Sequence, residues 1–196
     1  LGVSSYSFAK HIKETECDLF EVCRLAKEIG FEAIEFTNIN TPDPIATAKE
    51  LRAYCAQIGL EIAAHTIGAD LLNGDEETIL KNLYGLVDIA EALGVQGMRH
   101  DATGGYRNGE EKFNGFRQAL PRLIEGYRAV TEYAETKGIK TMIENHGYFC
   151  QDSDRVEKII TGVAHKNFGA LIDIGNFLCA DENPVNAVGR LAQFAS

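Results

Sequence analysis

The stretch 28-EIGFEAIEF-36 ends a helical pattern on a glycine and passes at once into a short apolar run. A glycine just past a helix end fits the left-handed C-terminal cap, and a run rich in Ile, Val and Phe is typical of a strand buried on both faces. The same junction recurs at 57-QIGLEIAAH-65, 92-ALGVQGMRH-100 and 137-KGIKTMIE-144. Four copies are hard to attribute to chance, so the sequence predicts a repeated unit in which a helix leads directly into a buried strand.

Two further apolar runs, 1–5 and 168–174, extend the series of predicted strands. We therefore expect strands to begin at about residues 1, 31, 60, 95, 139 and 168. Between them, apolar residues recur at a spacing of three and four, which predicts helices. Helix starts are marked by Pro44, by the acidic runs 75-DEE-77 and 152-DSD-154, and by the pair Asn183 and Pro184.

Strict alternation of strands and helices, at a spacing of about thirty residues, implies a parallel sheet with right-handed crossovers. A doubly wound open sheet suits six strands, but no G-x-G-x-x-G fingerprint follows the first strand. The remaining architecture is a (β/α)₈ barrel, which normally takes about 250 residues. The chain has 196 residues without a linker, and the spacing would start a seventh strand at roughly residue 197. We therefore expect residues 1–196 to form a single α/β barrel domain, present through about its sixth βα unit and cut before strands seven and eight.

Composition indicates a globular protein with a small-molecule partner. The formal net charge of -10, with 29 acidic against 19 basic residues, argues against a hold on nucleic acid, which depends on Lys and Arg. No apolar run reaches the length of about eighteen residues that spans a membrane. The five cysteines show no C-x-x-C pair and no zinc-ribbon spacing, which favours free thiols in a reducing compartment, by default the cytoplasm. Because the chain begins on Leu1 rather than methionine, a leader that has been removed stays an open alternative, as does a homo-oligomer.

Polar residues gather where the predicted strands end, and in parallel architectures function collects at the C-terminal ends of the strands. A strand end is also where burial stops, so a single polar residue there can be solvated or can cap the next turn. Both interpretations stay open for most of these positions, and an imidazole there suits an anion, a metal or a loop carbonyl. In strand order the residues are Ser5 and Tyr6, Glu35 and Thr37, His65, Arg99 with His100 and Asp101, Glu144 with His146, and Asp173 with Asn176.

Glu144 and Asp173 differ from the other candidates because each terminates a strand whose preceding residues are apolar. The fifth and sixth strands are adjacent in the predicted sheet, which brings the two carboxylates within reach of one ion. Two carboxylates so close would repel each other, and a divalent cation supplies the compensating charge. The sequence therefore predicts a metal site at this pair.

Four segments carry a resemblance to a known family: 2-GVSSYSF-8, 30-GFEAIEF-36, 143-IENHG-147 and 172-IDIGNFL-178. The chain resembles the xylose isomerase-like TIM barrel superfamily, and within it the sugar phosphate isomerase/epimerase branch, which includes ketose 3-epimerases, hydroxypyruvate isomerases and inosose dehydratases. The last two segments are the specific ones, since they place IENHG and D-x-G-N at consecutive strand ends.

The resemblance implies one divalent metal, commonly Mn, Mg, Co or Zn, held by four side chains at the ends of strands five to eight. Glu144 matches the ligand of strand five and Asp173 the ligand of strand six. The ligands of strands seven and eight would lie beyond Ser196, so this chain carries half of the expected protein ligands.

The activity implied is isomerisation or epimerisation of a sugar or sugar derivative, by proton abstraction next to a carbonyl through an enediolate. Glu144 would be ligand and acid/base, and His146 would contact a substrate oxygen or orient the metal ligands. The expected substrate contacts are His65, His100, Asn176, Tyr6 and Glu35, with Arg99 a weaker candidate.

Three alternatives remain open. A dehydratase of inosose type would use the same site. A phosphodiesterase like the related AP endonucleases would bind a zinc cluster, but that branch has His three residues after the sixth-strand Asp, where this chain has Asn176. The third alternative is a barrel fragment without catalytic activity.

Overall fold

A computed structural model of the chain describes residues 1–107, 109–112 and 114–196. Over these residues, six strands form one sheet in which each strand pairs in parallel with the next along the chain. This order is that of a (β/α)₈ barrel and confirms the predicted parallel sheet. The strands are β1 (Gly2–Ser4), β2 (Ala33–Phe36), β3 (Glu61–Ile67), β4 (Gly97–His100), β5 (Lys140–Glu144) and β6 (Phe168–Leu171).

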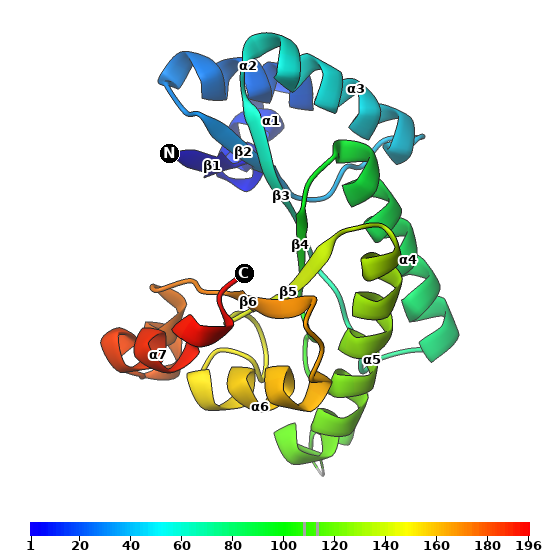
Figure 1. Ribbon diagram of the computed structural model, residues 1–196, viewed down its shortest axis with the longest axis vertical. Helices are drawn as coiled ribbons and strands as arrows, with labels where there is room; N and C mark the ends of the chain where they lie inside the picture. Colours follow the sequence, from blue (N-terminus) through cyan, green and yellow to red (C-terminus); the bar gives the residue numbers. More distant parts are fainter. Residues whose placement is uncertain (108, 113) are drawn as a thin grey trace.

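The helices lie along the outer side of a curved sheet, while its inner side faces an open space (Figure 1). Each strand-to-strand connection contains at least one helix, as parallel pairing requires. Within the described ranges the α-helices are α1 (Ala9–Thr15), α2 (Leu19–Ile29), α3 (Pro44–Ile58), α4 (Glu76–Leu93), α5 (Phe116–Thr136), α6 (Ser153–Val163) and α7 (Pro184–Leu191).

The predicted helix starts are confirmed by capping bonds. Asp75 caps α4 by accepting from the backbone N–H of Thr78 at 2.9 Å, and Asn183 caps α7 in the same way. At the other ends, α2 stops on Gly30 with φ 108° and α4 on Gly94 with φ 76°, both left-handed. The helix-to-strand junctions of the sequence are therefore glycine caps followed directly by strands.

The core lies between the sheet and the helix layer. In β2 and β4 every second residue is buried, so that Ile34, Phe36 and Met98 are fully enclosed while the residues between them are partly exposed. This alternation sends one set of side chains outward to the helices and the other into the barrel. The polar residues of the inner set are the ones available to form a site.

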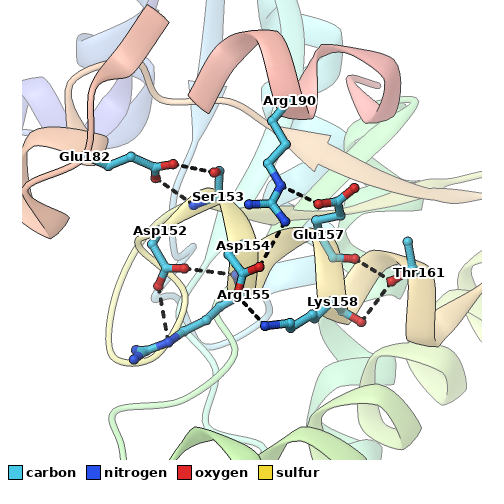
Figure 2. A network of polar contacts seen from close by, with 9 residues as sticks. All are labelled: Asp152, Ser153, Asp154, Arg155, Glu157, Lys158, Thr161, Glu182 and Arg190. Atoms are coloured by element: carbon cyan, nitrogen blue, oxygen red, sulfur yellow. Dashed lines mark hydrogen bonds and ion pairs between the residues drawn. The ribbon is translucent and has the colours of Figure 1, made fainter. Parts of the chain in front are cut away.

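The two segments that follow β5 and β6 are tied together by polar contacts between α6 and the region of α7 (Figure 2). The Glu182 carboxylate accepts from the backbone N–H of Ser153 at 2.8 Å and from the Ser153 hydroxyl. Arg190 on α7 pairs with Asp154 and Glu157 on α6. These contacts fix the position of α6, which follows β5, relative to Glu182 and α7, which follow β6.

The chain end lies along the edge of β6 that does not pair with β5. Ala195 forms a parallel bridge with Ala170, and the Ser196 N–H donates to the Ala170 carbonyl at 3.2 Å. Residues 195–196 therefore lie where the next parallel strand of a barrel would begin.

The five cysteines are free thiols, with Cys23 Sγ 3.5 Å from Cys55 Sγ inside the core. Among the described helices, none has both the length and the apolar character needed to cross a membrane.

Candidate active site

A cavity of about 620 Å³ opens inside the barrel, at the C-terminal ends of the strands. All six strands or the residues just after them contribute to its wall, from Ser4 at the end of β1 to Asp173 after β6. A larger hollow of about 860 Å³ is also present, but most of its wall comes from one segment, residues 147–155. Converging polar groups from separate strands favour the smaller cavity as the active site. The predicted site residues that line it are Tyr6, Glu35, Glu144, His146, Asp173 and Asn176, together with the weaker candidate Arg99.

Glu144 is the last residue of β5, and its two carboxylate oxygens have different partners. Oε2 accepts from Nε and Nη2 of Arg99, while Oε1 accepts from Nδ2 of Asn176 at 3.2 Å. The Glu144 side chain is 10% exposed and that of Arg99 is 12% exposed, so the ion pair is largely withdrawn from water. Arg99 thus supplies a fixed counter-charge to this carboxylate.

Asp173 follows β6, and its carboxylate organises the turn after the strand. Oδ1 accepts from the backbone N–H groups of Gly175 at 2.8 Å and Asn176 at 3.1 Å. Asn176 therefore touches both predicted metal ligands, Asp173 through its backbone and Glu144 through its side chain. The structure therefore joins the two carboxylates through one asparagine.

Asn145 also links the two strand ends, and no role was predicted for it from the sequence. Its Nδ2 donates to the Asp173 carbonyl at 2.7 Å, and its Oδ1 accepts from the Asp173 N–H at 2.8 Å. The residue is 1% exposed. The sequence signal that could have identified Asn145 is its position between Glu144 and His146, directly after the apolar residues of the fifth strand.

His146 follows β5, the strand next to β4, and contacts Asp101, a second residue without a predicted role. Nδ1 of His146 is 2.8 Å from Oδ1 of Asp101, which also accepts from Nη1 of Arg99 at 3.2 Å. Arg99 donates further to the Ile67 carbonyl at 3.1 Å. Glu144, Arg99, Asp101 and His146 therefore form one continuous chain of charged and polar contacts.

His65 and His100 do not reach the cavity. Both are fully buried on the outer side of the sheet, where Nδ1 of His65 lies 3.1 Å from the Phe36 carbonyl and the ring of His100 stacks on Tyr127. Burial lowers the pKa of both imidazoles, to about 4 for His100, so they are neutral near pH 7. The reason for this placement is the strand period of two, which turns their neighbours Thr66 and Arg99 inward instead.

The donor atoms of the cavity fit part of a metal site. Within the described ranges, no group of three or more His, Cys, Asp or Glu residues is arranged to hold an ion. Glu144 and Asp173 nevertheless supply two carboxylates, the oxygen ligands that hard divalent cations prefer. The hydrogen bonds that reach the Asp173 side chain from the described residues go to Oδ1, which leaves Oδ2 for another ligand.

Solved structures share this fold over the whole chain. D-psicose 3-epimerase from Clostridium cellulolyticum H10, crystallised with D-tagatose, matches with a TM-score of 0.80 at 17% identity, over 100% of this chain and 70% of that chain. The probable 3-DHS dehydratase AsbF of Bacillus anthracis matches with 0.78 at 19% identity, over 100% and 70%. A xylose isomerase-like TIM barrel protein from Mycobacterium smegmatis in complex with magnesium matches with 0.75 at 19% identity, over 100% and 72%.

No curated protein shows a significant match to the chain. Residues 23–194 match a family model described as a xylose isomerase-like TIM barrel. This match includes β2 to β6 with Glu144 and Asp173, and it covers every residue that lines the cavity except Ser4 and Tyr6. Because it spans most of the chain, the protein belongs to the xylose isomerase-like TIM barrel family.

Proposed function

We propose that the protein is a metal-dependent isomerase or epimerase of a sugar or sugar derivative, which abstracts a proton next to a carbonyl and passes through an enediolate. The observation that carries this proposal is the meeting of Glu144 and Asp173 at Asn176 inside the cavity that also holds His146. Membership of the family and the likeness to D-psicose 3-epimerase support it.

Glu144 and Asp173 would hold one divalent metal, Mn, Mg, Co or Zn. When bound there, such an ion supplies Lewis-acid polarisation of the substrate carbonyl and charge stabilisation of the enediolate. The magnesium complex of the related Mycobacterium smegmatis protein supports this cofactor. We further propose that strands seven and eight of the barrel follow Ser196 and carry the remaining ligands, which the position of residues 195–196 beside β6 supports.

The protein's own groups would move the proton. Glu144 lies on the cavity wall as a candidate acid/base, and Arg99 balances its charge on Oε2. Asp101 holds Nδ1 of His146, which leaves Nε2 of that imidazole to donate or accept a proton. Carboxylate and imidazole are among the side chains that serve as general acids and bases, and both lie on this cavity wall.

Substrate hydroxyl groups would bind the polar side chains around this centre. Tyr6, 73% exposed, follows β1, Glu35 lies in β2 and Asn176 follows β6, and all three line the cavity. His65 and His100 are buried on the helix side of the sheet and do not line the cavity. We therefore propose that they support the inward-facing Thr66 and Arg99 and do not contact the substrate. The net charge of -10 disfavours a nucleic-acid partner, and the five free thiols favour a reducing compartment such as the cytoplasm. The likeness to D-psicose 3-epimerase supports a small carbohydrate substrate.

The test uses the complete natural protein. Its metal content is measured first, and turnover is then assayed against a panel of ketoses and inososes. We expect bound divalent metal, activity on a member of the panel, and loss of that activity in Glu144→Gln. Glu61→Gln, an exposed carboxylate at the start of β3, is the matched control and should keep full activity.

Retained activity in Glu144→Gln contradicts the role given to this carboxylate. Elimination of water from an inosose, without isomerisation, would assign the dehydratase alternative on the same site. Cleavage of DNA containing an abasic site would assign the nuclease alternative, which the Asn176 position and the acidic net charge disfavour. A protein that binds no divalent ion and turns over no compound of the panel would favour the barrel without catalytic activity.

A further inference from the structure

The carboxamide of Asn145 makes a two-way contact with the backbone of Asp173. It donates to the carbonyl at 2.7 Å and accepts from the N–H at 2.8 Å, so both peptide groups of Asp173 are satisfied by one side chain. The residue is 1% exposed, which strengthens both bonds because water does not compete for them. Removing the side chain would leave two backbone groups without these partners.

The Asn145 contact takes the place of backbone pairing just beyond the point where β5 and β6 stop pairing. The backbone register of β5 and β6 runs from Thr141 and Phe168 to Glu144 and Leu171, and β6 stops there. A carboxamide carries the same donor and acceptor as a peptide group, so the Asn145 side chain continues the pairing for Asp173. It thereby fixes the position of Asp173 relative to Glu144, the residue directly before Asn145.

A second asparagine bridges the same two strands at their opposite end. Asn167, just before β6, donates from Nδ2 to the Ile139 carbonyl at 2.6 Å. That contact also stabilises the strand pair, but it lies at the end away from the cavity and touches neither carboxylate. The chain thus offers a matched pair of interstrand amides, one at the candidate site and one remote from it.

We propose that Asn145 is a positioning residue for the metal site, which holds the Asp173 backbone so that its carboxylate and that of Glu144 can bind one divalent ion. The inference rests on the proposed function, since it requires that these two carboxylates are ligands. Partners that orient metal ligands typically change metal affinity by about 10- to 100-fold when removed.

The experiment compares Mn²⁺ binding by the complete natural protein with binding by Asn145→Ala and Asn167→Ala, using isothermal titration calorimetry. Thermal unfolding of each variant without metal is recorded alongside, so that affinity is measured well below the unfolding transition. Asn145→Ala is expected to bind Mn²⁺ about 10- to 100-fold more weakly. Asn167→Ala is expected to lose thermal stability but to keep the parent affinity.

Parent-like Mn²⁺ affinity in Asn145→Ala overturns the proposal, and so does an equal loss in both variants, because the effect would then be general weakening of the strand pair. If Asn145→Ala does not fold, Asn145→Ser, whose hydroxyl keeps a polar group at this position, gives the decision by the same affinity comparison. A parent protein that fails to bind Mn²⁺ instead removes the proposed metal site, and this inference with it. The two failures are therefore distinguishable.

Discussion

Arg99 and Glu144 lie 45 residues apart in the sequence and form an ion pair on the cavity wall. Both guanidinium contacts go to one oxygen, Oε2, so that Oε1 of the carboxylate stays available to Asn176. The arginine also reaches Asp101 and the Ile67 carbonyl, which makes it the common partner of β3, β4 and β5 at this end of the barrel.

Replacement of Arg99 should be costly because it leaves a mostly buried carboxylate without its counter-charge. We expect Arg99→Met to lower the free energy of unfolding by about 3 kcal/mol. Urea denaturation monitored by circular dichroism measures this. The control is Arg24→Met, since Arg24 pairs with Glu21 and Glu28 on an exposed face of α2, where water screens the pairs and their loss should change stability little. Equal decreases in the free energy of unfolding of the two variants would show that the cavity ion pair stabilises the protein no more than an exposed pair does.

The buried imidazole of His100 should make stability depend on pH. Burial lowers its pKa in the folded protein to about 4, against 6.5 as the ordinary value. Between these values the unfolded chain binds a proton that the folded protein does not, so stability is complete above about pH 6.5 and falls as the pH drops toward 4. The expected loss from this residue is about 3 kcal/mol over that window.

The measurement is urea denaturation at a series of pH values from 7 down to about 4, the window set by the two His100 pKa values. His100→Leu should lose less stability across this window than the parent protein, because no imidazole is left to protonate on unfolding. The exposed His11→Leu serves as control and should follow the parent. A His100→Leu variant with the same pH slope as the parent would contradict the expectation.

The contacts between α6 and the α7 region in Figure 2 should divide into strong and weak ones. Glu182 satisfies the backbone N–H and the hydroxyl of Ser153, a residue that is 1% exposed, so Glu182→Ala should cost about 1–3 kcal/mol. Arg190 makes exposed ion pairs with Asp154 and Glu157, which water screens, so Arg190→Ala should lower stability less than Glu182→Ala does. Thermal or urea unfolding of the two variants measures both losses of stability. A larger loss in Arg190→Ala than in Glu182→Ala would contradict the prediction.

The parallel sheet could be predicted because its signals are local. Gly30 and Gly94 follow helical patterns and adopt the left-handed caps that glycine favours, and the apolar runs after them become strands. Glu144 and Asp173 were likewise recognisable as strand-end carboxylates, and the structure places both on the wall of one cavity. Their roles as metal ligands stay a prediction.

The direction of individual side chains was harder to predict. At the end of β4 the sequence offers Arg99, His100 and Asp101 in succession, and neighbouring residues of a strand point to opposite faces. An error of one residue in where a strand ends therefore exchanges inward and outward positions. His100 fell on the helix side, and Arg99 with Asp101 on the cavity side.

The sequence by itself determined the order of strands and helices, the parallel pairing and the strand ends that carry polar residues, because caps and apolar periods act over a few neighbouring positions. Only the tertiary structure decided which of those residues meet. The ion pair of Arg99 with Glu144, the contact of Asp101 with His146 and the bonding of Asn145 to Asp173 join residues 28 to 45 positions apart. Such contacts depend on strand register and on the face each side chain takes, and both are fixed only when the sheet curves and the helices pack against it.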